Sequence, residues 1–291
     1  DELSDDDEDD AEDDELLEET VGMMLPLSDI DEALELHPSV VILGGAGSGK
    51  STTLRRVALE KIWTYRSDTD TSSLPIWIDL ANGDDEHPEK LLANAAPLDE
   101  DALQDLILED RIILFLDGLN EMGDNGPRRA KQLSDWLYEA NSPEQALVAC
   151  RAANYGASLN LDVPIVALDP LDAEQVREMA ALHLEGEQLS QLLGQLIAAD
   201  DILQNPLVVI PMYLCQIINL FQHAPQEPLP STLAKLIQKW VALVWTQTHQ
   251  PHANHKAIEA SLSQLAAAML DENTASTVEL IWAIQKITGK N

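Results

Sequence analysis

Runs of aliphatic and branched residues recur along the first 170 positions of the chain, each bounded by polar or glycine-containing segments. Five of them have the length and continuity of a strand that is buried on both faces. They are 40–43 (VVIL), 75–80 (PIWIDL), 112–116 (IILFL), 146–150 (ALVAC) and 164–168 (PIVAL). Helical spacing of apolar residues at 50–65, 102–109 and 128–141 alternates with these runs. The alternation predicts an α/β fold whose parallel sheet is covered by helices on both faces.

The strand pattern stops after Asp169-Pro170, and the rest of the chain has helical spacing. Successive helices are predicted at about 173–184, 189–198, 208–221, 232–246 and 256–270. A proline-rich segment at 224–230 separates the last two from the others. We therefore expect an α/β domain at 28–170, a helical domain at 171–228 and a further helical region at 229–291. At the start of the first domain, Ser28 with Asp31 three positions later predicts a capped helix that ends at His37-Pro38.

Between the first predicted strand and the next helix lies Gly44-Gly45-Ala46-Gly47-Ser48-Gly49-Lys50-Ser51, which fits the phosphate-loop pattern G-x-x-x-x-G-K-[ST]. Its glycines let backbone N–H groups converge on phosphate oxygens, and the following helix adds the positive end of its dipole. We expect Lys50 to reach the β- and γ-phosphates and Ser51 to ligate Mg²⁺. Thr52, the next residue, is expected to contact the nucleotide as well. A glycine-rich turn without a ligand is the alternative interpretation.

Asp117 directly follows the buried run at 112–116. The Mg²⁺ that bridges the β- and γ-phosphates is normally held by an acid at the end of another strand, so we expect Asp117 to ligate it. Glu121 is expected to orient or deprotonate the attacking water, with Asn120 as a polar helper. The alternatives are an acid that caps a turn and ordinary polar loop residues.

Arg151 follows the run at 146–150. In a parallel sheet it would emerge at the same carboxyl edge as the phosphate loop and Asp117. A cation there can sense or neutralise the γ-phosphate. A surface salt bridge is the alternative.

Acidic residues outnumber basic ones by 52 to 17, a formal net charge of −35, which disfavours binding to nucleic acid or anionic lipid. Fourteen of the acids and no base fall in residues 1–20. We expect 1–27 to be a flexible, solvated acidic tail, with attraction of a basic partner as the alternative. The most apolar segment, 203–221, contains two prolines and several amides, so a buried helix is expected there and no membrane span.

The two cysteines, Cys150 and Cys215, stand far apart in apolar surroundings and are expected to be reduced and buried. A basic segment followed by an apolar one is missing at the start, so no secretory signal is expected. These features favour a cytoplasmic protein.

Four segments, in this order, resemble the NACHT group of signal-transduction ATPases with numerous domains (STAND), relatives of animal NOD-like receptors and prokaryotic antiphage sensors. They are VVILGGAGSGKSTTLRRVALE, RIILFLDGLNEM, ALVACRAANY and NPLVVIPMYL. The resemblance covers about residues 35–270. It implies the three-layer P-loop NTPase fold, then a helical domain, and the start of a winged-helix domain from about Thr232.

The resemblance also implies roles for individual positions. Those that match are Lys50, Ser51 and Asp117 for phosphate and Mg²⁺, Gly118 for the small residue after the acid, Glu121 for the second acid, and Arg151 for the first sensor position. Pro206 looks like the helical-domain proline that packs on adenine, although an ordinary first-turn proline fits the same context. Many members have Asp where this chain has Asn120. The absence of that acid in this chain favours slow hydrolysis.

By this resemblance we expect a Mg²⁺-dependent ATPase that changes conformation between ATP and ADP and assembles into a homo-oligomer on activation, in signalling or defence, with effector and sensor domains elsewhere. The alternatives are a nucleotide-locked scaffold without turnover, a motor or transporter ATPase, and a small-molecule kinase. A kinase would need an arginine-rich lid, whereas 169–201 contains one arginine, Arg177. ATP is expected over GTP because no Asn-Lys-x-Asp motif occurs.

Overall fold

The computed structural model describes residues 26–27, 29–81, 87–96, 98–139, 142–143, 145–198, 206–247, 252–271 and 286. Five strands form one sheet in the order β2-β3-β4-β1-β5, and every neighbouring pair is parallel. Their bounds are β1 (Ser39–Gly44), β2 (Leu74–Asp79), β3 (Ile112–Asp117), β4 (Gln145–Arg151) and β5 (Ile165–Ala167). The predicted parallel sheet is confirmed.

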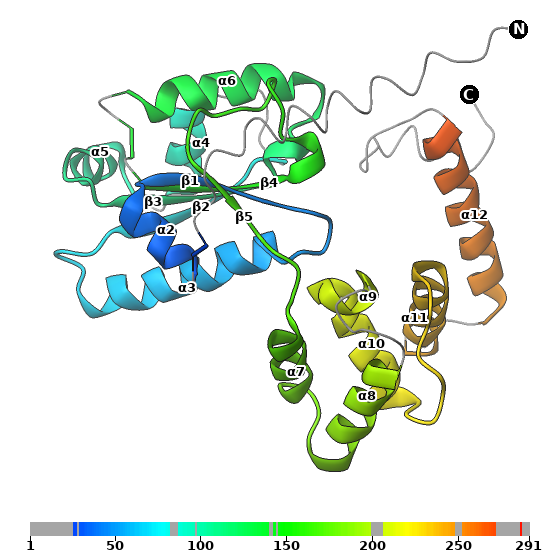
Figure 1. Cartoon of the computed structure of the whole chain (residues 1–291). Coiled ribbons are helices and arrows are strands. Elements are labelled where there is room, and N and C mark those ends of the chain that lie inside the picture. The colour runs from blue at the N-terminus through cyan, green and yellow to red at the C-terminus, as the bar shows by residue number, and fades with distance from the viewer. Residues whose placement is uncertain are drawn as a thin grey trace, which may run out of the picture.

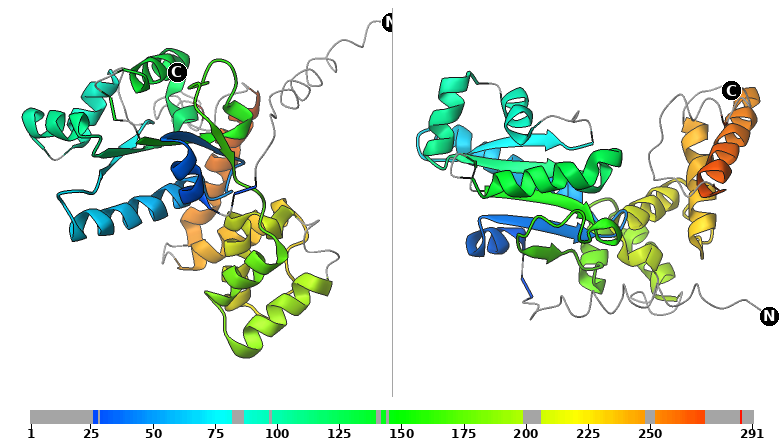
Figure 2. Two further views of the ribbon diagram at one scale, coloured as in Figure 1. Left: turned by 60° about the vertical axis from the view of Figure 1, so that its left-hand side comes forward. Right: turned by 90° about the horizontal axis from the view of Figure 1, so that it is seen from above.

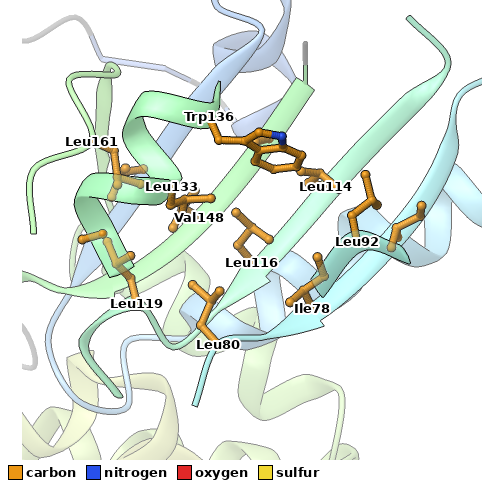
Figure 3. Close-up of a cluster of buried hydrophobic side chains, with 14 of the residues drawn as sticks. Ile78, Leu80, Leu92, Leu114, Leu116, Leu119, Leu133, Trp136, Val148 and Leu161 are labelled. Carbon is orange, nitrogen blue, oxygen red and sulfur yellow. The ribbon is translucent and has the colours of Figure 1, made fainter. Parts of the chain in front are cut away.

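Helices cover both faces of this sheet (Figure 1). On one face lie α2 (Ile30–Leu36) and α3 (Lys50–Ser67), and on the other lie α4 (Pro88–Ala95), α5 (Glu100–Leu108) and α6 (Gly126–Leu137). Successive side chains of a strand point to opposite faces. Thus Leu114 and Leu116 pack under α6 together with Trp136, as Figure 3 shows, while Phe115 is buried on the α2 and α3 side. The predicted three-layer architecture is therefore present.

The first helix differs from its prediction at its start. Its N-cap is Asp29, whose Oδ1 accepts a hydrogen bond from the backbone N–H of Glu32 at 3.1 Å. Ser28, the predicted cap, lies outside the described residues. The helix ends before His37, as predicted.

Helices also follow the sheet, and they lie beyond its carboxyl edge (Figure 2). They are α7 (Ala173–Ala181), α8 (Gly186–Ala198), α9 (Pro206–Val209), α10 (Pro211–His223), α11 (Leu233–Gln247) and α12 (His252–Asp271). Side chains from α7 to α11 share one buried cluster, which includes Val176, Leu192, Ile217 and Leu236. The proposed division at 228/229 is thus bridged by a common apolar cluster, and the start of a winged-helix domain stays a prediction.

The helix predicted at 208–221 is divided at Ile210, which has an extended backbone with φ −96° and ψ 118°. Pro211 explains the division, because a proline restricts the residue before it to extended conformations. Pro211 then begins α10, where its missing N–H costs nothing.

The predicted burial of the two cysteines is confirmed for Cys150 and wrong for Cys215. Cys150 is fully buried, as expected, and burial raises the pKa of its thiol to about 11. Cys215 is exposed, so its predicted burial is wrong. Leu214, Ile217 and Ile218 form the inward face of α10, and Cys215 stands on another face.

Across the described residues, no helix has the length and apolarity needed to cross a membrane. The predicted acidic tail falls almost entirely outside the described residues, as does 272–285.

Candidate functional site: a phosphate loop at the carboxyl edge of the sheet

The phosphate-loop segment joins the end of β1 to the start of α3. Gly47 and Gly49 have φ values of +77° and +102°, a region that favours glycine, so the loop conformation requires them. A Cβ at Gly44 would collide with the hydroxyl of Ser48, whose Oγ is buried and lacks a hydrogen-bond partner among the described residues. A Cβ at Gly45 would meet no atom within 4 Å, so open space lies beside the loop for a bound group.

The ammonium group of Lys50 folds back over this loop. Its Nζ donates to the carbonyl oxygens of Gly44 at 2.7 Å and of Gly45 at 2.8 Å. Burial lowers the pKa of Lys50 below its usual 10.5, and the nearby guanidinium of Arg151 lowers it further. Both hydrogen-bond acceptors of the ammonium are neutral carbonyls, so an anion at this place would compensate its charge better than they do.

Ser51 and Asp117 meet across two elements. Ser51 Oγ donates to Asp117 Oδ1 at 2.9 Å, which joins the first turn of α3 to the end of β3. A hydroxyl and a carboxylate are hard oxygen ligands of the kind that Mg²⁺ prefers, and Mg²⁺ takes its other ligands from phosphates and water. This pair therefore fits a Mg²⁺ ion that is held together with a nucleotide.

Arg55, one helical turn after Ser51, is a further residue beside Asp117 that was not predicted from the sequence. Its guanidinium is 4.0 Å from Asp117 Oδ2 and lies over the ring of Trp77, 5.6 Å from the centroid. Asp117 thus has a hydroxyl on one oxygen and a cation near the other. Spacing along α3 could have indicated this contact, since residues four apart share a helix face.

The residues after β3 curl into the 3₁₀ helix η1 (Leu119–Glu121). Gly118 allows this turn with φ +85°, and the N–H of Glu121 donates to the Gly118 carbonyl at 2.8 Å. Asn120 Oδ1 accepts a hydrogen bond from the backbone N–H of Arg151 at 3.0 Å, so this oxygen ties the turn to β4.

Arg151 ends β4, directly opposite Gly44 in the parallel register. Its Nη2 is 3.6 Å from Glu121 Oε1. Both side chains are partly exposed, 37% for Arg151 and 39% for Glu121, so solvent or a ligand can reach the pair. The carboxyl edge of the sheet therefore gathers Lys50, Ser51, Asp117, Asn120, Glu121 and Arg151.

The helical region contacts the phosphate loop through Met212, a residue that the sequence analysis did not assign to the site. Its backbone N–H donates to the Gly47 carbonyl at 3.2 Å, and a Cβ built at Gly47 would lie 2.8 Å from its Cβ. Thr52 lies exposed on the first turn of α3. Pro206 begins α9, but its side chain falls outside the described part of the chain.

A parallel sheet, a glycine loop between β1 and α3, and an acid at the end of β3 together define the class of P-loop NTPases. Residues 39–187 match the family model of the NACHT domain, which is just over half of the chain. The chain belongs to the NACHT family, as its sequence resemblance predicted. A search among curated proteins gives no match. Nucleotide binding is a property of this family of NTPases.

Proposed function

We propose that the chain is a Mg²⁺-dependent ATPase with slow turnover that works as a conformational switch of the NACHT STAND class. The observation that carries this proposal is the convergence of Lys50, Ser51 and Asp117 at one edge of the sheet. Separate strands supply the loop and the acid, as triphosphate and metal binding require.

Within this proposal the phosphate loop binds the triphosphate of ATP. The backbone N–H groups of residues 44–49 and the ammonium of Lys50 balance the phosphate charge, with Thr52 beside them. Ser51 and Asp117 hold Mg²⁺, which neutralises charge that develops on the phosphate oxygens. Pro206 packs on the adenine base, as the family resemblance implies.

Glu121 is the proposed base for hydrolysis. Its carboxylate accepts a proton from the water that attacks the γ-phosphorus, while the bond from that phosphorus to the bridging oxygen breaks and ADP leaves with the electron pair. Arg151, 3.6 Å from Glu121 Oε1, can turn toward the γ-phosphate when ATP is bound and release the carboxylate. Asn120 supports both residues through its hydrogen bond to the Arg151 backbone.

The contact of Met212 with Gly47 supports the switch. It joins the start of α10 directly to the loop that would hold the phosphates, so a change in the loop alters the packing of the helical region against it. ATP and ADP can shift the population of two arrangements only if they bind them with different affinity. A loop that contacts both the nucleotide and α10 provides such a difference.

Self-assembly into a homo-oligomer on activation, effector and sensor domains elsewhere in a longer protein, and a cytoplasmic role in signalling or defence belong to the same proposal. Their support is membership of the NACHT family alone.

A nucleotide-locked scaffold without turnover is the second candidate. The family resemblance favours it, because many members have Asp where this chain has Asn120. The structure adds that Arg151 lies close enough to Glu121 to hold its carboxylate. Such a protein would bind ATP tightly and keep it.

Single-turnover hydrolysis of ATP separates the two candidates. Glu121→Gln should keep ATP affinity and lose hydrolysis by about 100-fold or more, in the range that general bases contribute. Glu178→Gln, at an exposed position of α7, is the matched control and should hydrolyse ATP at the wild-type rate. Equal rates for wild type and Glu121→Gln would remove Glu121 from the mechanism. No hydrolysis by the wild type would favour the scaffold.

A further inference from the structure

One arginine of the α/β domain is buried on the face of the sheet opposite α3. Arg129 is the fourth residue of α6 and is only 6% exposed. Its Nη1 donates to the carbonyl oxygen of Met122 at 3.3 Å, and its Nη2 donates to that of Leu80 at 3.1 Å. The guanidinium thus bridges two backbone segments that are far apart in the sequence.

These two segments lead to the two acids of the site. Met122 is the residue directly after Glu121. The N–H of Leu80 donates to the carbonyl oxygen of Asp117 at 2.9 Å, so Leu80 is bonded to Asp117 through its nitrogen and to Arg129 through its oxygen. One buried side chain therefore connects Met122, the last residue of the turn 118–122, to Leu80, which is itself bonded to Asp117 at the end of β3.

Burial of a charged guanidinium is costly, and an apolar side chain of similar size often gives equal or greater stability. Leu80 and the apolar residues of the turn belong to an apolar cluster on this face of the sheet. Leu119 and Leu80 point into the cluster that contains Leu133 of α6 (Figure 3). The planar guanidinium donates in two fixed directions, so it fixes two carbonyls relative to each other, which an apolar side chain cannot do.

Few hydrogen bonds within the turn 118–122 hold its backbone. It begins at Gly118 with a left-handed backbone, and its own hydrogen bond is that from Glu121 N–H to the Gly118 carbonyl. Asn120 fixes the turn toward β4 on one side. Arg129 fixes it toward β2 and α6 on the other.

We infer that Arg129 is a positioning residue, which holds the turn 118–122 so that Glu121 stays at the same edge as Asp117. The inference rests on the proposed role of Glu121 in hydrolysis. Arg129 itself contacts neither acid side chain by these bonds and acts through the backbone.

The experiment compares Arg129→Met with Ser134→Ala in the whole chain. Ser134 is the matched control because it lies on the same helix, is similarly buried at 8%, and donates to a loop carbonyl, that of Leu161, at 3.1 Å. Three quantities are measured: the single-turnover rate with Mg²⁺ and ATP, the ATP dissociation constant, and hydrogen exchange of the amides in 118–122.

Arg129→Met is expected to lower the hydrolysis rate by about 10- to 100-fold, as small displacements of catalytic groups do. The ATP dissociation constant should stay within about threefold, because the phosphate loop is untouched. Exchange of 118–122 should become faster than in Ser134→Ala, in which all three quantities for the site should match the wild type. A general loss of stability would instead change both variants alike.

Wild-type hydrolysis and wild-type exchange of 118–122 in Arg129→Met would overturn the inference. If that variant does not fold, Arg129→Lys replaces it, since it keeps the charge without the two-pronged geometry. It should show the same changes to a smaller extent. A wild-type hydrolysis rate together with wild-type exchange of 118–122 in Arg129→Lys would refute the inference. If Glu121→Gln hydrolyses ATP like the wild type, the proposed role of Glu121 as the base fails, while exchange in 118–122 still decides whether Arg129 holds the turn.

Discussion

The hydrogen bond between Ser51 and Asp117 leads to a prediction that separates a structural role from metal binding. Ser51→Ala removes a donor that lies 2.9 Å from a carboxylate oxygen. Hydrogen bonds to charged groups contribute about 1.5–3 kcal/mol. Since the Asp117 side chain is 19% exposed and water can partly replace the lost donor, we expect the lower end, about 1.5 kcal/mol. The free energy of unfolding without nucleotide should fall by this amount.

Asp117→Asn should differ from Ser51→Ala in its free energy of unfolding without nucleotide, but the two variants should agree in their response to Mg²⁺ when ATP binds. Its amide oxygen still accepts from Ser51, so only the difference between a charged and a neutral acceptor is lost, about 1 kcal/mol or less. Ser51→Ala removes a hard oxygen ligand, and Asp117→Asn replaces a charged oxygen ligand with a neutral one. In both, the gain in ATP affinity on adding Mg²⁺ should therefore shrink by on the order of tenfold or more, which is 1.4 kcal/mol or more.

Urea unfolding without nucleotide measures the first effect, and calorimetric titration with ATP in EDTA and in Mg²⁺ measures the second. Thr64→Ala is the control, because it removes an exposed hydroxyl from the same helix, one that bonds only the Glu60 carbonyl in its own turn. A wild-type response to Mg²⁺ in either site variant would exclude metal binding by Ser51 and Asp117 as a pair. Loss of that response in Thr64→Ala would show that the effect is not specific to the pair.

Two further predictions concern the phosphate loop. Gly47→Ala should weaken ATP binding by on the order of tenfold, because its Cβ would lie 2.8 Å from the Cβ of Met212 at a φ of +77°. Gly123→Ala controls for the strained backbone alone, since Gly123 has φ +71° and nothing within 4 Å; equal affinities in calorimetry would count against the contact with α10. Because the pKa of Lys50 is lowered, its ammonium loses a proton below pH 10.5, and ATP affinity should fall as the pH rises toward that value. Arg151→Met should move this fall to higher pH; an unchanged pH profile would exclude Arg151 as a cause.

β1, β3 and β4 could be predicted closely from the sequence because each is an apolar run without alternation, as expected of a strand that is covered on both faces. The run at 164–168 was also expected to be buried on both faces, but Ile165 and Ala167 of β5 are exposed at the edge of the sheet, so that expectation is wrong. The prediction at 40–43 falls within β1 (Ser39–Gly44), and that at 112–116 within β3 (Ile112–Asp117). The helix α4 was not predicted. With its 8 residues it is too short to establish a helical period.

The residues of the candidate site could be selected from the sequence, and their roles stay predictions, but their arrangement could not be predicted. The pattern around Lys50 and the acid after the third run identify the chemistry locally. Strand order decides the rest: Arg151 stands opposite Gly44 because β4 lies between β3 and β1, and nothing within either segment fixes that order. The contact of Met212 with Gly47 likewise depends on how the helical region packs on the sheet.

Arg129 did leave a signal in the sequence. It occupies the same helix face as Leu133 and Trp136, at spacings of four and seven residues, and both of these are buried. A cation on the apolar face of a helix predicts burial against backbone carbonyls or an acid. The pattern could therefore have identified the residue, whereas its partners, the carbonyls of Leu80 and Met122, follow only from the fold.

Nucleotide binding at the phosphate loop can be measured by calorimetric titration with Mg²⁺ and ATP, with Lys50→Ala beside the wild type and Lys61→Ala as the control. Lys61 is on the same helix, but its Nζ lies 3.8 Å from Asp31 and away from the loop. The wild type and Lys61→Ala should bind one ATP per chain with similar affinity, and Lys50→Ala should show no detectable binding, because the phosphate charge is left uncompensated. ATP binding by Lys50→Ala with the affinity of the wild type would contradict the assignment of this loop as the nucleotide site.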